Sequence, residues 1–244
     1  MFQQHNNTKY DNWSSSGNGS GSNIMKNLSK QQQDVIARFE GNVSIGLTTD
    51  EATKRREISG TFNVIKPPID CPAWVCCLLP CIKNIPSMKS FALIKPDDAE
   101  ILRNNKWVRY DSTSLVTGDI IRLDEGDIIP ADCIILENSS STEEFLIDSK
   151  AVVGNDKLQS YPGSNNVSSS SLPLAQLYMG SHVVQGGATA IVTAIGQDTL
   201  LSNLIKEKKF PPKGNVLLDD DGGDGDGYGE QAEDGISLMS RQVT

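Results

Sequence analysis

The sequence has no long hydrophobic run. The apolar stretch from Ala73 to Ile82 is about half of the roughly 20 residues that a membrane-spanning helix needs, and Pro80 interrupts it. The N-terminus also lacks the basic start and apolar core of a secretory signal. From these absences we expect an intracellular protein without a membrane-spanning segment.

Basic charge and histidine are scarce as well. The chain carries 22 Lys and Arg against 31 Asp and Glu, a formal net charge of −9, and only two histidines. This acidic balance gives no general attraction to nucleic acid, so no nucleic-acid partner is expected. Residues 1–30 are rich in Gln, Asn, Ser and Gly, and residues 207–244 are acidic and glycine-rich. Both segments have too few apolar side chains to offset the entropy of ordering and are predicted to be disordered tails.

What is present is organised around residues 115–136, LVTGDIIRLDEGDIIPADCIIL. Two Gly-Asp pairs and one Pro-Ala-Asp separate short runs of β-branched apolar residues. Such runs are typical of strands joined by tight turns, because glycine reaches positive φ without steric cost and aspartate hydrogen-bonds nearby backbone. We therefore interpret Asp119, Asp127 and Asp132 as turn and capping residues and assign them no chemistry.

The order of these residues strongly resembles the signature that opens the actuator domain of P-type ATPases, the membrane pumps that form an aspartyl-phosphate. The family reads close to L-V-x-G-D-I-v-x-L-x-x-G-D-x-I-P-A-D, and nearly every fixed position is present between Leu115 and Asp132. The resemblance implies a mainly β (α+β) fold, a distorted jelly roll or β-sandwich, preceded by a short helical element.

A second resemblance lies upstream, at residues 46–65, GLTTDEATKRREISGTFNVI. Thr48 and Glu51 fit a capping box at the start of a helix, and Gly60 suits a left-handed exit from it. The piece resembles the element that precedes the first membrane helix in many cation pumps. An earlier short helix is indicated by apolar residues spaced on one face, Val35, Ile36 and Phe39.

The remaining elements are predicted from apolar runs between turn residues. We expect strands at 91–95, on either side of a turn at Asn104-Asn105, at 145–153 and on either side of Gly186-Gly187, and a short helix from Thr199 to Lys206. The expected domains are a disordered tail (1–30), a helical element (31–66), a Cys-rich apolar linker (67–86), the actuator-like β domain (87–206) and an acidic disordered tail (207–244).

The resemblance is weakest where the family carries its chemistry. In the pumps, a T-G-E-S loop enters the phosphorylation site, and its glutamate positions the water that hydrolyses the aspartyl-phosphate. The matching residues here are Val153, Gly154, Asn155 and Asp156, so only the glycine is kept. An amide has no useful basicity near neutral pH, and Asp156 is displaced by one position. We therefore expect a degenerate loop with no catalytic residue and no cofactor.

The wider sequence agrees with that expectation. The 244 residues contain no D-K-T-G-T, the motif that carries the phosphorylated aspartate in the family. A shared fold does not transmit an activity whose site is missing. We therefore expect a protein that is not an enzyme and does not pump ions by itself.

Four of the five cysteines, Cys71, Cys76, Cys77 and Cys81, lie in the apolar segment CPAWVCCLLPCIKNIP. Their spacing lacks the paired C-x2-C of common zinc sites and no histidine is near, so no metal site is predicted. Disulfides are not expected in a reducing compartment. Adjacent cysteines among apolar residues suit S-acylation and insertion at a membrane interface. The alternative is a buried apolar segment whose cysteines act as small hydrophobes.

Three functions are compatible with these features. The first is a non-catalytic actuator-like module at the cytoplasmic face of a membrane, which would bind or regulate a transporter or P-type ATPase. The second is a fragment of a split cation-transporting ATPase that works with a membrane-embedded partner. The third is an acylated scaffold whose disordered ends bind other proteins.

Overall fold

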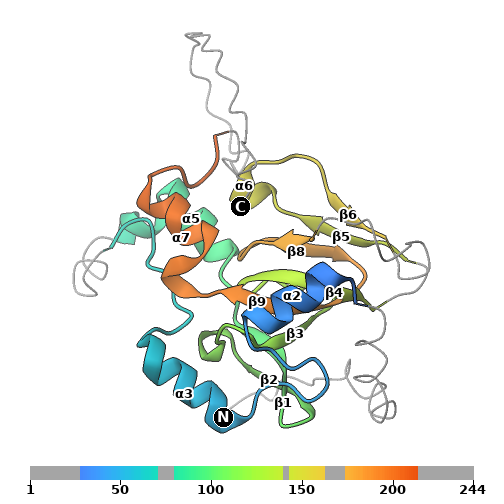
Figure 1. Ribbon diagram of the computed structural model, residues 1–244. Helices are drawn as coiled ribbons and strands as arrows, with labels where there is room; N and C mark the ends of the chain where they lie inside the picture. Colours follow the sequence, from blue (N-terminus) through green and yellow to red (C-terminus); the bar gives the residue numbers. More distant parts are fainter. Residues whose placement is uncertain (1–27, 71–79, 140–142, 163–173, 214–244) are drawn as a thin grey trace, which may run out of the picture.

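The computed structural model describes residues 28–70, 80–139, 143–162 and 174–213 (Figure 1). The helices are α2 (Lys30–Arg38), α3 (Thr49–Ser59), α5 (Pro86–Leu93), α6 (Lys150–Val153) and α7 (Leu200–Lys206), with 3-10 turns η1 (Pro80–Asn84), η2 (Ser112–Ser114) and η4 (Gly196–Asp198). The strands are β1 (Asp98–Arg103), β2 (Lys106–Asp111), β3 (Ile120–Leu123), β4 (Asp132–Asn138), β5 (Phe145–Asp148), β6 (Gln159–Tyr161), β7 (Gln176–Leu177), β8 (His182–Gln185) and β9 (Ala188–Ala194).

The strands form two antiparallel sheets. The larger has the order β2-β1-β3-β9-β4-β7, and the smaller has the order β6-β5-β8. The two glycines Gly186 and Gly187 join β8 to β9, so this turn carries the chain from the small sheet to the large one. The expected fold class is confirmed: antiparallel sheets dominate a mixed α+β structure.

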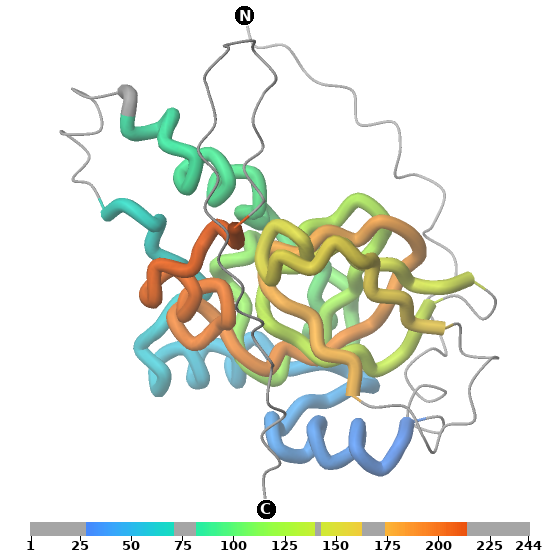
Figure 2. The backbone as a smooth tube through the Cα atoms, turned by 90° about the horizontal axis from the view of Figure 1, so that it is seen from above, coloured from blue at the N-terminus to red at the C-terminus, as the bar shows by residue number. Residues whose placement is uncertain are grey.

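The main core lies between the two sheets. Phe145 and Ile147 of β5 pack in one cluster with Ile121 of β3 and Val192 of β9, and all four are fully buried. Side chains alternate across a strand, so Ile120 and Ile191 point to the opposite face of the large sheet. That second face is covered by α2, which gives the body three layers (Figures 1 and 2).

Helix α2 is fixed to the large sheet by one side chain that has two roles. The Gln32 Oε1 atom accepts from the backbone N–H of Ser29, 2.9 Å away, and closes the capping box of the helix. Its Nε2 atom donates to the carbonyl oxygens of Ile135, at 3.1 Å, and Leu136, at 2.8 Å, on β4. The start of the helix and its docking therefore depend on the same amide group.

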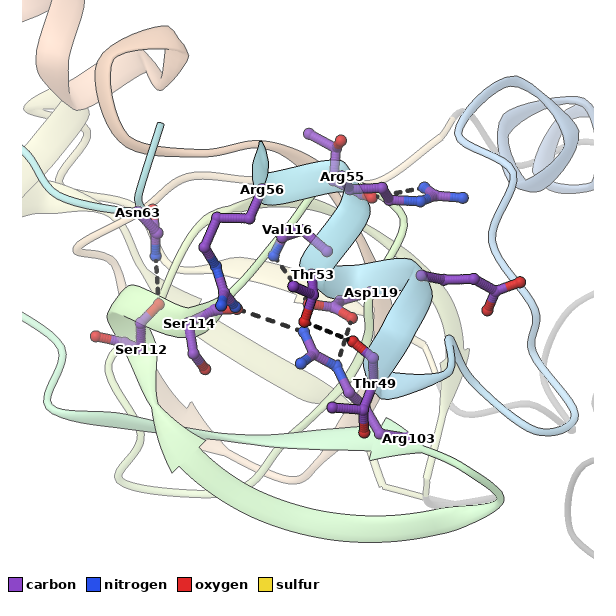
Figure 3. A network of polar contacts seen from close by, with 12 residues as sticks. Thr49, Thr53, Arg55, Arg56, Asn63, Arg103, Ser112, Ser114, Val116 and Asp119 are labelled. Atoms are coloured by element: carbon purple, nitrogen blue, oxygen red, sulfur yellow. Dashed lines mark hydrogen bonds and ion pairs between the residues drawn. The ribbon is translucent and has the colours of Figure 1, made fainter. Parts of the chain in front are cut away.

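Helix α3 is attached to the β body by two arginines (Figure 3). Arg55 Nη1 donates to the carbonyl oxygens of Phe39 and Thr117, each 2.8 Å away. Arg56 Nη2 donates to the carbonyl oxygen of Ser114 at 2.8 Å. These carbonyls lie in loops, where no strand partner satisfies them, so the two arginines take the place of ladder hydrogen bonds.

A buried ion pair joins the end of β1 to the loop that precedes β3. Arg103 Nη2 lies 2.6 Å from Asp119 Oδ2, Arg103 Nε lies 3.2 Å from Asp119 Oδ1, and both side chains are buried. The Asp119 carboxylate also accepts from the backbone N–H of Val116 at 2.9 Å. Burial raises the pKa of Asp119, and the hydrogen bond from Arg103 opposes that rise.

Most local expectations are confirmed. Thr48 and Glu51 form the predicted capping box, and Gly60 ends α3 with a φ of 61°. The hairpin turn lies at Asn104 and Asn105, whose φ angles of 50° and 63° suit a tight β-hairpin. The predicted apolar face of the first helix, Val35, Ile36 and Phe39, packs on the large sheet. The two strands around the Gly-Gly turn and the helix that follows Thr199 are also present.

One predicted strand is wrong, and another is shorter than predicted. Residues 91–95 were expected to form a strand, but α5 runs from Pro86 to Leu93, because proline at a first helical position favours the helix. The predicted strand 145–153 ends at Asp148. The Asp148 carboxylate accepts from the Lys150 N–H at 2.8 Å, and this local turn starts α6.

Arg103→Met is expected to lower the free energy of unfolding by about 3–5 kcal/mol, because it leaves the buried Asp119 carboxylate without its partner. The control is Lys209→Met, which removes an exposed ion pair with Glu207 and should cost less than about 1 kcal/mol. Denaturant unfolding of both variants measures the difference. Equal losses of unfolding free energy in the two variants would contradict a larger contribution from the buried pair than from the exposed one.

The deficit of Arg103→Met should also depend on pH. Burial raises the pKa of Asp119 above its unfolded value, and the variant removes the interaction that opposes this rise. In the variant, the stability linked to Asp119 is fully present below the unfolded pKa of this carboxyl. It is lost as the pH rises through the folded pKa. Unfolding curves at acidic and neutral pH test this sign.

Candidate functional site

The loop at residues 153–156 follows one turn of helix. The helix α6 is anchored by Val152, whose side chain is fully buried against Ile94, Met179 and Leu201. Gly154 ends the helix with a φ of 75°, and its N–H donates to the Lys150 carbonyl at 2.9 Å. The tip of the loop therefore rests on a rigid apolar base.

The polar side chains of the loop are used locally. The Asn155 side-chain oxygen accepts from the backbone N–H of Lys157 at 3.1 Å, which forms a local turn. The Asp156 carboxylate lies 2.9 Å from Lys150 Nζ, and this hydrogen bond raises the pKa of Lys150. Both members of that ion pair are substantially exposed, so the pair is weak. Val153 is partly exposed and has no polar group to offer.

A segment after α7 reaches this loop, which the sequence did not indicate. Phe210 is buried in the same cluster as Val152 and Leu201. Pro212 lies so close to Gly154 that a Cβ atom placed on the glycine would be 2.8 Å from the Pro212 Cβ. A contact between residues almost 60 positions apart leaves no periodic signal in the sequence. Residues 207–213 (the C-terminal strap) thus cover one side of the loop.

The three aspartates of the central stretch have structural roles. The Asp127 carboxylate accepts from the Asp124 N–H at 2.9 Å and closes a turn. The Asp132 carboxylate accepts from the N–H groups of Met179, at 2.9 Å, and Leu200, at 2.7 Å, and so supports the start of α7. Burial raises the pKa of Asp127 and of Asp132. The pairing of Asp119 with Arg103 was not predicted from the sequence.

The cysteine segment stays a prediction. Cys71, Cys76 and Cys77 lie outside the described residues, and so does the side chain of Cys81. Cys133 is fully buried, and burial raises the pKa of its thiol well above the usual range, which makes it unreactive. Within the described ranges, no group of three or more His, Cys, Asp or Glu residues could hold a metal ion. None of the helices in those ranges is both long and apolar enough to cross a bilayer.

Gly154→Ala should lower the free energy of unfolding by more than Gly60→Ala. Both glycines end helices with positive φ, and alanine costs about 1 kcal/mol there, but only Gly154 has Pro212 against it. When Pro212 is also replaced by glycine, Gly154→Ala should lower the free energy of unfolding by no more than Gly60→Ala does. Thermal or denaturant unfolding of the set measures it. An excess that survives Pro212→Gly would show that the strap does not press on the loop.

Comparison with known proteins covers the same region. A family model described as the P-type ATPase actuator domain matches residues 93–209. The protein named "Probable plasma membrane ATPase" of Dictyostelium discoideum is 34% identical over 48% of this chain and 10% of its own length. An endoplasmic reticulum calcium ATPase of Aspergillus fumigatus is 32% identical over 44% of this chain and 11% of its own.

A sodium/potassium-transporting ATPase subunit alpha of Hydra vulgaris is 28% identical over 50% of this chain and 11% of its own length. The solved structure of a zinc-transporting PIB-type ATPase is 19% identical over 48% of this chain and 17% of that one, with a TM-score of 0.38. This chain thus spans only about a tenth of the length of these curated relatives. About half of it, residues 93–209, is a P-type ATPase actuator domain.

Proposed function

We propose that this protein is a non-catalytic actuator-domain module that binds or regulates a cation-transport protein at the cytoplasmic face of a membrane. The observation that carries the proposal is the state of the loop at 153–156. Asn155 stands where the resemblance places the catalytic glutamate, and its side-chain oxygen is committed to the Lys157 N–H. A group that positions an attacking water must offer a basic atom to it.

Asp156 is the remaining carboxylate in the loop. It lies one residue beyond the expected position and is paired with Lys150 at 2.9 Å. A displacement of this size is costly in catalysis, because rates depend on the placement of reacting groups to within about 1 Å. Its Oδ1 atom is also engaged by the Lys150 ammonium. Asp156 is therefore a poor substitute for the glutamate.

A binding role fits the parts that are kept. The sheets, the core and the helices α3 and α7 form the rigid body to which the loop is attached. Without the carboxylate, such a body offers shape and surface rather than chemistry. Attachment at the membrane is assigned to the Cys-rich segment, by acylation of Cys76 and Cys77 or by direct insertion of its apolar side chains.

The purified full chain should not hydrolyse ATP or acetyl phosphate above the rate of the Asp156→Ala variant. Neither Asn155 nor the paired Asp156 can position water as a free carboxylate would. Release of inorganic phosphate measures both reactions. The matched comparison is Asp148→Ala, which alters the helix start but not the loop tip. Hydrolysis that Asp156→Ala abolishes and Asp148→Ala preserves would overturn the proposal.

The second candidate is a fragment of a split cation-transporting ATPase. It is favoured by the comparisons, in which the chain matches only 10–11% of three ATPases, whose names refer to the plasma membrane, to endoplasmic reticulum calcium and to sodium/potassium transport. A partner would then supply the membrane and phosphorylation domains, and its own chemistry would meet the loop of this chain.

For this second candidate, the tagged full chain should co-purify from detergent-solubilised native membranes with a polypeptide that carries a phosphorylatable aspartate. Mass spectrometry identifies the partner, and removal of this chain should reduce ion transport by the complex. Pull-downs without any pump-like polypeptide would rule out the split pump. If such pull-downs recovered another membrane protein instead, they would still support the non-catalytic binding module.

A further inference from the structure

The segment Thr61–Lys66, which leaves α3, is pinned to the β body by a buried amide. Asn63 Nδ2 donates to the carbonyl oxygens of Ser112, at 2.9 Å, and Pro130, at 2.8 Å. Asn63 Oδ1 accepts from the N–H of Gly196 at 2.9 Å. Figure 3 shows the Asn63 side chain directed at Ser112. One side chain therefore joins this segment to three separate turns of the body.

This anchoring decides which side chains face outward. Asn63 and Ile65 are buried, and around Asn63 the chain makes a tight turn in which the Val64 N–H donates to the Phe62 carbonyl at 2.7 Å, so that Phe62 and Val64 face solvent. Phe62 is 59% exposed and Val64 is 51% exposed. Ile58, on the last turn of α3, is 86% exposed. Three large apolar side chains are thus presented within seven residues.

Phe62 is also held in place from below. The Arg56 guanidinium lies 5.7 Å from the centre of the Phe62 ring, and it is itself fixed by its hydrogen bond to the Ser114 carbonyl. A cation over one face of the ring restrains the ring while much of it stays open to solvent. The exposed ring is therefore preorganised for contact rather than left free to collapse onto the body.

The charge around these side chains differs from that of the whole protein. Between Ile58 and Pro96 the sequence has four lysines and a single acidic residue, Asp70, although the chain as a whole carries −9. All four of those lysines, Lys66, Lys83, Lys89 and Lys95, are exposed in the structure. This part of the acidic protein is locally basic.

The exposed apolar side chains also lie close in the chain to the Cys-rich segment. Six residues lie between Val64 and Cys71, which limits the path between them to about 25 Å. On the other side of that segment, η1 and α5 carry Lys83 and Lys89. Both views of the molecule place η1, α5 and the end of the 61–70 segment on the same side of the β body (Figures 1 and 2).

We propose that Ile58, Phe62 and Val64, with Lys66, Lys83 and Lys89, form a docking surface for a bilayer rich in anionic lipid. The proposal rests on the membrane association given under the proposed function and adds a second contact that needs no acylation. Phe and Ile side chains enter the headgroup boundary, and lysines bind anionic headgroups. Lysine is depleted in the cores of protein interfaces, so this composition fits lipid better than a protein partner.

The test uses the full chain produced in bacteria, with intact mass confirming unmodified cysteines. Sedimentation measures binding to vesicles of phosphatidylcholine and phosphatidylserine, and to vesicles of phosphatidylcholine alone. Wild-type protein should bind the anionic vesicles more tightly. The double variant Ile58→Ser, Phe62→Ser should need at least about tenfold more lipid for half-binding, because two inserted apolar side chains are lost. The control is Leu158→Ser, which replaces another exposed apolar side chain, next to β6 of the small sheet, and this variant should bind as wild type.

Each result separates this surface from the proposed function. Matching unfolding curves for the three proteins establish that folding is unchanged. Equal binding by the double variant and wild type overturns the surface, while leaving membrane attachment through the Cys-rich segment intact. An absence of wild-type binding to either vesicle also overturns it, and exposed apolar residues would then indicate a protein partner. Neither result alters the outcome of the phosphate-release or pull-down experiments.

Discussion

The structure depends on how the backbone carbonyls of residues 112–119 are satisfied. Within this loop only Gly118 and Asp119 exchange backbone hydrogen bonds with a strand, at Val192 of β9, and buried carbonyls without hydrogen bonds are costly. Side chains from the preceding helical element supply the donors: Asn63 to Ser112, Arg56 to Ser114 and Arg55 to Thr117. The helical element and the β body are thus one mechanical unit, although they are separate in the sequence.

That unit determines what the loop at 153–156 can do. Its base shares an apolar cluster with Ile65 from the helical element and Phe210 from the C-terminal strap. Segments before and after the sheets therefore converge beneath α6. Under the proposed binding role, such a base would keep a surface in shape, which is what binding requires.

Sequence patterns predicted the features that depend on near neighbours. The capping box at Thr48 and the turn at Asn104-Asn105 need only residues a few positions apart, and the order of the central stretch identified the family. The strand expected at 91–95 failed because apolar content alone does not distinguish a short strand from a helix that begins at Pro86. The contacts Arg103–Asp119 and Gly154–Pro212 join distant residues, so only the folded chain reveals them.

The amide of Gln32 has a consequence for ageing of the protein. Glutamate serves as well as glutamine in most capping boxes, but here the nitrogen of the same side chain donates to two carbonyl oxygens of β4. Deamidation at this one position would exchange that donor for a charged oxygen facing those carbonyls. The docking of helix α2 would then depend on its apolar contacts alone, chiefly Val35 in one cluster with Ile120 and Ile191, while the core between the sheets would be unaffected.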